Sequence, residues 1–295
     1  MTKILRMLLP ARDEQYRGAV VHEKMTALLL GDAMSPHTDM NASSHDKKKR
    51  NQWAVDGRLA ARPTDAYLVA LHGANTAAAE QYRKLYSEIV RAGRVRSLRT
   101  LLVASALAGE GKTLTAVNLA LTIAASSNEQ RALLVETDFR KPRIQKLLNT
   151  QPKCGLTDYL SGDVECAQLI HTTPIPGLAV VYAGHHINNL ARLLNSEKIA
   201  TFFHQIASQE HYSHIILDSS PILLTSEPIA LIPHVDAAIF VVHAGKTSRE
   251  VVNQAIEILG QENIFGCVFN GMTSLDSYYS RHYYSSDYYH SSSYI

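Results

Sequence analysis

Residues 106–113 read Ala-Leu-Ala-Gly-Glu-Gly-Lys-Thr and hold the side chains best suited to phosphate chemistry. Glycines let the backbone approach phosphate oxygens where a Cβ would collide. Backbone N–H groups of such a turn and the positive end of a following helix form an anion site. We expect the Lys112 ammonium to reach the β- and γ-phosphates of ATP and the Thr113 hydroxyl to ligate Mg²⁺. The predicted nucleotide contacts are Gly109, Glu110, Gly111, Lys112, Thr113 and Leu114.

The sequence on either side predicts the elements that this loop requires. Residues 101–104 form a short apolar run typical of a buried strand, and residues 114–124 have the apolar spacing of a helix. A strand, a glycine-rich turn and a Lys-Thr pair opening a helix are the context of a phosphate-binding loop. Ala106 stands where the strict pattern has glycine, so an ordinary strand–helix turn with a surface lysine is the alternative.

Carboxylates follow two further apolar runs. Glu136 and Asp138 end the run that starts at Leu133, and Asp218 ends the run that starts at His214. Phosphoryl transfer needs a held Mg²⁺ and a placed nucleophile more than it needs covalent help from the protein. We expect Asp218 and Asp138 to hold the metal, and Glu136 to accept the proton of an attacking hydroxyl. Acidic residues that only begin solvent-facing loops are the alternative.

Strand and helix patterns alternate along most of the chain, which predicts a P-loop-type α/β fold with a mainly parallel sheet and helices on both faces. In such folds ligands bind at the carboxyl ends of the strands. The expected strands are 100–104, 132–136, 178–182, 214–217, 237–242 and 265–269. The expected helices are 76–91, 112–126, 142–149, 188–208, 226–232 and 248–260.

Two terminal regions differ from this pattern. Residues 1–78 form a predicted N-terminal extension or linker, with a polar, charged stretch at 41–50 and an apolar patch at 67–71 that is a candidate for docking. Residues 79–273 form the predicted main domain. Residues 274–295 have no Leu, Val or Met after Leu275, so we expect this tail to be disordered. Its hydroxyl nucleophiles are Tyr278, Tyr279, Tyr283, Tyr284, Tyr288, Tyr289 and Tyr294.

Composition narrows the class of protein. A formal net charge of +2 over 295 residues argues against nucleic-acid binding. Three cysteines at unrelated spacings fit reduced thiols in the cytoplasm. No run reaches the roughly 18 apolar residues of a spanning helix, and the N-terminus lacks an adequate signal sequence. We therefore expect a cytoplasmic protein that reaches the membrane through a partner.

These motifs, in this order, resemble the bacterial tyrosine autokinases (BY-kinases) of capsule and exopolysaccharide loci. The resemblance runs from about residue 79 to residue 270 and includes the phosphate loop and the segments 136–142, 218–221, 241–247 and 266–270. The tyrosine cluster that follows this range adds to the resemblance. It implies Mg-ATP-dependent phosphorylation of the chain's own C-terminal tyrosines, between neighbours in a homo-oligomeric ring. It also implies a membrane-anchored polysaccharide co-polymerase as activator, at the inner face of the plasma membrane, and a counteracting tyrosine phosphatase.

The sequence departs from the family at several positions. Glu136 stands where the family usually has Asp, and His243 where an Arg is common. Glu80 and Arg83 match the family's assembly helix, but Tyr86 replaces its second Arg, which places the ring in question. Arg140 is expected either to contact phosphate or to be a structural ion-pair partner. Asn270 is a candidate for contacting the base.

Two other functions fit parts of the sequence. A nucleotide-switch ATPase resembling the partition and cell-division-site ATPases would share the sheet, but these typically carry a second lysine where this chain has Leu107, and they lack a tyrosine-rich end. A catalytically inactive adaptor of a polysaccharide export complex would fit Glu136 and Tyr86. The retained Lys112, Asp138 and Asp218 argue against inactivity.

Overall fold

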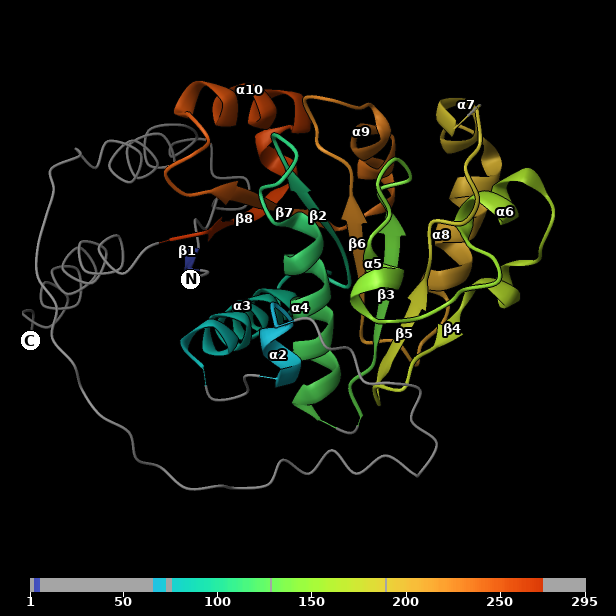
Figure 1. Ribbon diagram of the computed structural model, residues 1–295, viewed down its shortest axis with the longest axis horizontal. Coiled ribbons are helices and arrows are strands. Elements are labelled where there is room, and N and C mark those ends of the chain that lie inside the picture. The colour runs from blue at the N-terminus through green and yellow to red at the C-terminus, as the bar shows by residue number, and fades with distance from the viewer. Residues whose placement is uncertain (1–2, 6–65, 73–75, 128, 189, 273–295) are drawn as a thin grey trace, which may run out of the picture.

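The computed structural model describes residues 3–5, 66–72, 76–127, 129–188 and 190–272. These residues form an eight-stranded sheet with strand order β1-β8-β7-β2-β6-β3-β5-β4 and helices on both faces (Figure 1). The strands are β1 (Lys3–Leu5), β2 (Thr100–Ser105), β3 (Ala132–Thr137), β4 (His171–Thr172), β5 (Leu178–Val181), β6 (His214–Ser219), β7 (Ala237–His243) and β8 (Ile264–Asn270).

The sheet is parallel except at its two edges. The strands from β8 to β5 run parallel to one another, and the edge strands β1 and β4 pair antiparallel with β8 and β5. The carboxyl ends of the parallel strands therefore meet at one edge of the sheet, called here the carboxyl edge. In register, Asp218 of β6 is paired with Val103 of β2 on one side and with Glu136 of β3 on the other. The predicted fold class is confirmed.

Alternate side chains of each strand enter two separate apolar cores. Leu101 and Val103 pack with residues of α2, α3, α4 and α5, whereas Leu102 and Ala104 pack with residues of α6 to α10. Successive side chains of a strand point to opposite faces of the sheet, and here both faces are covered by helices. Each central strand is therefore buried on both sides, which explains why the strand sequences are continuous apolar runs.

The helices that cover these faces are mostly short; α3 and α4 are the two longest, and α4 is the more central of them (Figure 1). The α-helices are α2 (Val69–His72), α3 (Ala77–Gly93), α4 (Lys112–Ser126), α5 (Ile144–Leu147), α6 (Leu156–Ser161), α7 (Leu190–Leu194), α8 (Glu197–Ala207), α9 (Glu227–Leu231) and α10 (Arg249–Leu259). The 3₁₀ helices are η2 (Cys166–Leu169), η3 (Ile232–His234) and η4 (Gln261–Asn263).

Two predicted helices are corrected by the structure. The single helix expected at 188–208 is two helices, because the chain leaves helical geometry at Ser196, the N-cap of α8. The helix expected at 142–149 is only one turn, Ile144–Leu147. Pro142 disfavours helical geometry in the residue before it, and Asn149 adopts a left-handed φ of 52° after the turn.

Part of the predicted N-terminal extension belongs to the folded body. The Asn118 side chain, buried in α4, accepts a hydrogen bond from Ala70 N at 3.0 Å and donates to Tyr67 O at 3.0 Å. Leu68 between them is fully buried, so the apolar patch at 67–71 docks as predicted. Residues 6–65, with the charged stretch at 41–50, and the tail at 273–295 lie outside the described residues.

Candidate functional site

The phosphate-loop sequence leaves β2 at the carboxyl edge and enters α4 at Lys112. Gly111 is the N-cap of α4 with φ 96°, a left-handed conformation that glycine adopts without strain. A Cβ on Gly111 would also collide with the side-chain amide of Asn270. Two features therefore favour glycine at this position: its left-handed φ, and the Asn270 side chain that occupies the place of a Cβ. The turn and the N-terminus of the fifteen-residue α4 form the geometry of an anion site.

Glu110 holds this loop from inside the protein. Its carboxylate accepts hydrogen bonds from Leu107 N at 2.7 Å and from the Thr247 hydroxyl, and the residue is 3% exposed. Asn270, at the end of β8, donates from Nδ2 to the Glu110 carbonyl at 3.0 Å. The side chains of Glu110 and Asn270 thus support the loop, and the base contact predicted for Asn270 stays a prediction.

Asp218 lies at the carboxyl edge beside the start of α4. It is 1% exposed, and among the described residues neither of its carboxylate oxygens has a hydrogen bond of ordinary geometry. Burial raises the pKa of Asp218 to about 8, although the Thr113 hydroxyl and the Lys112 ammonium act in the opposite direction. Charge on so deeply buried a carboxyl is costly, and a divalent cation would stabilise the charged form. The oxygen ligands of Thr113 and Asp218 therefore fit Mg²⁺.

Glu136 makes contacts that its position in the sequence does not reveal. Its Oε1 accepts hydrogen bonds from Arg143 N at 2.6 Å and Ile144 N at 2.7 Å, and its Oε2 accepts one from Ala183 N at 3.2 Å. Burial raises the pKa of this carboxyl, while the three amides lower it. The predicted role of Glu136 as proton acceptor stays a prediction, and these contacts favour a positioning role.

Asp138 and Arg140 follow Glu136 at the carboxyl edge. Asp138 is 8% exposed and accepts a hydrogen bond from Lys141 N at 3.1 Å. Arg140 donates from Nε to Glu227 Oε1 at 2.9 Å, with its side chain 62% exposed. Of the two roles expected for Arg140, the ion pair is the one present here. Glu227, buried at the start of α9, is a site residue that sequence reasoning missed.

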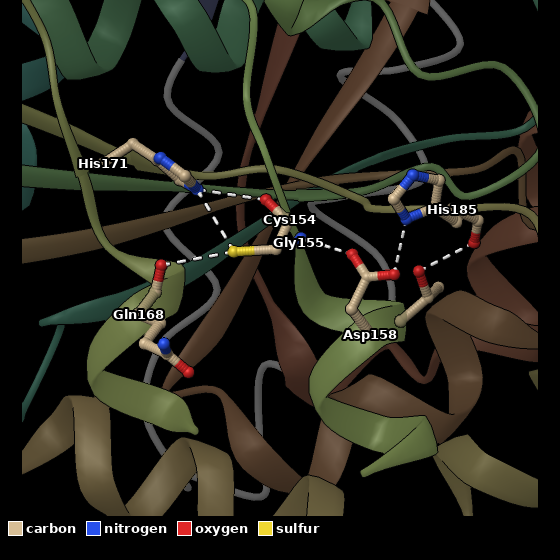
Figure 2. Close-up of polar contacts among 7 residues, drawn as sticks. Cys154, Gly155, Asp158, Gln168, His171 and His185 are labelled. Atoms are coloured by element: carbon tan, nitrogen blue, oxygen red, sulfur yellow. Dashed lines mark hydrogen bonds and ion pairs between the residues drawn. The ribbon is translucent and has the colours of Figure 1, made fainter. Parts of the chain in front are cut away.

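A second polar cluster joins α6 to the loop after β5 (Figure 2). Asp158 accepts a hydrogen bond from Gly155 N at 2.6 Å and contacts His185 Nδ1 at 2.6 Å. Beside it, His171 Nε2 lies 3.0 Å from the Cys154 carbonyl, and the Cys154 thiol lies 3.4 Å from the Gln168 carbonyl. This cluster fixes the loop whose Ala183 amide binds Glu136.

The contact with Asp158 raises the pKa of His185, first through the hydrogen bond and then through the carboxylate charge. We expect His185 to titrate above the ordinary histidine value of about 6.5 and Asp158→Asn to remove the rise. Because the folded pKa is raised, the pair stabilises fully below pH 6.5 and loses its effect as pH rises through the folded pKa. NMR titration of the histidine ring signals in the wild type and in Asp158→Asn measures this effect. An unchanged His185 titration in Asp158→Asn would contradict this assignment.

The substituted residue of the predicted assembly helix faces the chain's own fold. Tyr86 donates its hydroxyl to Gln130 Oε1 at 3.2 Å, and its ring meets the His214 ring edge-on with centroids 5.4 Å apart. Glu80 and Arg83 form an exposed ion pair of 2.6 Å on the same helix, α3. Tyr86 therefore anchors α3 to the sheet.

Known proteins similar to this chain are named tyrosine-protein kinases. The chain is 30% identical over 205 residues to the tyrosine-protein kinase CpsD of Streptococcus pneumoniae, covering 68% of this chain and 88% of CpsD. The chain belongs to the bacterial tyrosine-protein kinase family. No protein-family model matches it. The predicted resemblance is confirmed, and membership favours the tyrosine kinase over the switch ATPase and the inactive adaptor.

Two further relatives extend the comparison of this bacterial tyrosine kinase. It is 26% identical over 247 residues to the succinoglycan biosynthesis transport protein ExoP of Rhizobium meliloti, covering 82% of this chain but 31% of ExoP. The kinase domain of the Escherichia coli tyrosine kinase ETK superposes with a TM-score of 0.66 at 24% identity, covering 76% of this chain and 86% of that domain. The fold is thus that of a tyrosine kinase domain.

In the part of the kinase that the structure describes, no helix is both long enough and apolar enough to cross a membrane.

Proposed function

We propose that this chain transfers the γ-phosphoryl group of ATP to tyrosine hydroxyls of its own C-terminal tail. The bond that forms joins the tyrosine oxygen to phosphorus, the bond that breaks joins phosphorus to the ADP oxygen, and the hydroxyl proton leaves to a carboxylate of the site. The observation that carries this proposal is the buried Asp218 carboxylate, without an ordinary hydrogen bond among the described residues, beside Lys112 and Thr113. A bound divalent cation would stabilise the charged form of this carboxyl, and the neighbouring lysine and loop amides suit the phosphates of a nucleotide.

The proposed roles follow the positions of the residues. The loop amides of Gly109, Gly111 and Leu114, with the Lys112 ammonium, would hold the phosphates of ATP. Thr113 and Asp218 would hold Mg²⁺, and Asp138 would hold the metal or its waters. Mg²⁺, when bound, neutralises charge on the transferred phosphoryl group. Arg140, held by Glu227, would present its free guanidinium nitrogens to phosphate.

The proposed setting of this reaction rests on the relatives. ExoP carries a polysaccharide transport function in its name, and its length is about three times the stretch shared with this chain. We infer that the chain acts in exopolysaccharide or capsule synthesis, as a cytoplasmic homo-oligomer beside a membrane-anchored co-polymerase. A tyrosine phosphatase would reverse the modification, and no nucleic-acid partner is proposed.

Phosphosite mapping tests the proposed reaction. The purified chain is incubated with Mg-ATP, and tail peptides are analysed by mass spectrometry. We expect phosphate on tyrosines between Tyr278 and Tyr294 in the wild type, and at least a 100-fold loss in Lys112→Met, because the loop then lacks its phosphate-binding charge. Lys153→Met removes an exposed lysine away from the loop and serves as the matched control.

A second arm of the experiment adds the cytoplasmic segment of a membrane activator, which covers the case of a chain that has no activity by itself. An unmodified tail in this arm, with ATP still hydrolysed, would overturn the tyrosine kinase in favour of the switch ATPase. An unmodified tail without hydrolysis would favour the inactive adaptor. Equal modification in wild type and Lys112→Met would show that the phosphate loop is not the site.

A further inference from the structure

The carboxylate of Glu136 closes a loop of the chain onto itself. We propose that Glu136 is a positioning residue, which fixes the metal-facing segment of the site, and that it is not the acceptor of the tyrosine proton. The segment from residue 136 to residue 144 is called here the Glu136 loop. The inference rests on the proposed function where phosphotransfer activity is measured. Amide hydrogen exchange of the loop tests it independently of that function.

Three segments of the chain meet at this one side chain. Oε1 binds the amides of Arg143 and Ile144, seven and eight residues further along, and Oε2 binds the amide of Ala183 after β5. Hydrogen bonds from amides to an ionised carboxylate are about twice as strong as neutral ones. Glu136 itself belongs to β3. Its side chain therefore joins the start of the Glu136 loop to the end of that loop and to the segment that follows β5.

Asp138 and Arg140, which are proposed to contact the metal and the phosphate, lie between these ties. Asp138 is turned back onto the loop through Lys141 N at 3.1 Å, and Arg140 reaches across to Glu227 of α9 at 2.9 Å. With both ends of the loop fixed, these two side chains have only a short span of backbone in which to move. Catalytic side chains held by such contacts keep the geometry that transition-state stabilisation needs.

The neighbouring connection is itself held by backbone and side-chain contacts. Leu156 N and Thr157 N donate to the carbonyls of Tyr182 and Ala183 at 2.8 and 2.9 Å, and Asp158 contacts His185 (Figure 2). The Ala183 amide is therefore presented to Glu136 from a rigid frame. Loss of the Glu136 carboxylate would leave three buried amide donors without this acceptor.

These contacts leave little room for proton transfer. A general base must bring a free lone pair within about 2.6–3.2 Å of the substrate hydroxyl. Two amides bind Oε1 and one binds Oε2, and the residue is 1% exposed, so the remaining lone pair on Oε2 is buried away from a substrate hydroxyl. The length of the side chain also matters, since aspartate is shorter by one C–C bond of about 1.5 Å and would draw the acceptor away from all three amides.

Two conservative variants separate the roles, because the roles predict opposite orders of activity. Glu136→Gln keeps the length and one acceptor oxygen for Arg143 and Ile144, so we expect it to retain at least a tenth of wild-type phosphotransfer. Glu136→Asp keeps the carboxylate but loses the reach, so we expect a further tenfold loss or more. A general base gives the reverse, since removing it costs about 10²–10⁴-fold and an aspartate would still accept the proton.

Amide hydrogen exchange of the nucleotide-free protein is the structural readout. We expect the amides of Arg143, Ile144 and Ala183 to exchange at least tenfold faster in Glu136→Asp than in the wild type. Glu136→Gln is expected to keep protection at Arg143 and Ile144 and to lose it mainly at Ala183, where its NH₂ group meets another donor. Glu257→Gln and Glu257→Asp, on the exposed face of α10, are matched controls.

The outcomes are distinct. A 100-fold loss in Glu136→Gln with the Arg143 and Ile144 amides still protected would overturn the proposal in favour of a general base. Protection that is unchanged in Glu136→Asp would overturn it as well. If the wild type transfers no phosphate even with the activator segment present, the proposed function fails, and the exchange pattern alone still decides whether Glu136 fixes the loop.

Discussion

Replacing Asp218 with asparagine is expected to abolish phosphotransfer and, at the same time, to stabilise the nucleotide-free protein. The buried carboxylate has no ordinary hydrogen bond among the described residues, and burial raises its pKa to about 8. A raised folded pKa means that the folded state binds a proton which the unfolded state releases, so stability falls as pH rises from about 4 to about 8. Asparagine has no charge to desolvate and should add about 2–4 kcal/mol to the free energy of unfolding at pH 7.

Denaturant unfolding at pH 5 and pH 7.5 measures this effect, and tail phosphorylation measures the activity. We expect the gain of Asp218→Asn over wild type to be larger at pH 7.5 than at pH 5. Asp163→Asn, at an exposed aspartate, should change neither quantity. A destabilised Asp218→Asn with the same pH slope as wild type would show that the carboxylate has a structural partner.

Replacing Gly155 with alanine is expected to cost about 3 kcal/mol of folding free energy, at the upper end for an overpacked site. The backbone of Gly155 is extended, with φ −155° and ψ −166°, so alanine could adopt it. The added Cβ, however, would collide with Gly184 N and Tyr182 O and would lie 2.6 Å from Gly184 Cα. All three are backbone atoms, which cannot rotate away as a side chain could, and Tyr182 O already accepts a hydrogen bond from Leu156 N of α6.

Gly93→Ala is the matched control for this prediction. Gly93 ends α3, and an added Cβ there meets no atom within 4 Å, so alanine should be neutral or stabilising by up to about 1 kcal/mol. Thermal and denaturant unfolding compare the two variants. If Gly155→Ala were as stable as Gly93→Ala, the α6 connection would be looser than the contacts indicate.

The sequence predicted the sheet well because its central strands are buried on both faces. A short, continuous apolar run between two helical patterns, such as residues 237–242, is typical of a buried parallel strand. The sequence did not predict β1 and β4, the antiparallel edges, because two or three residues carry no periodicity. Helix α4 was predicted at its observed bounds, because the glycines before it and the Lys-Thr pair at its start mark where it begins. The short α6 and the break at Ser196 depend instead on tertiary packing.

The site was predicted unevenly for a related reason. Residues of the phosphate loop are adjacent in sequence, so their spacing alone places Lys112 and Thr113 together at the start of α4. Glu136 shows the limit of this reasoning. Its carboxylate oxygens bind amides that are seven, eight and 47 residues away in the sequence. Sequence spacing cannot show which of the surrounding groups a carboxylate side chain contacts. Glu227 was missed similarly, because its partner Arg140 lies 87 residues earlier.

The end of β8 has a kinetic consequence for the proposed reaction. Asn270 binds the phosphate loop, so the chain leaves its last described strand directly beside the nucleotide site. Tyr278 follows Met272 by six residues, a distance of at most about 21 Å when extended. A substrate on so short a tether has an effective concentration on the order of millimolar. Its modification within one subunit would be independent of dilution, whereas transfer between subunits would slow as the oligomer dissociates.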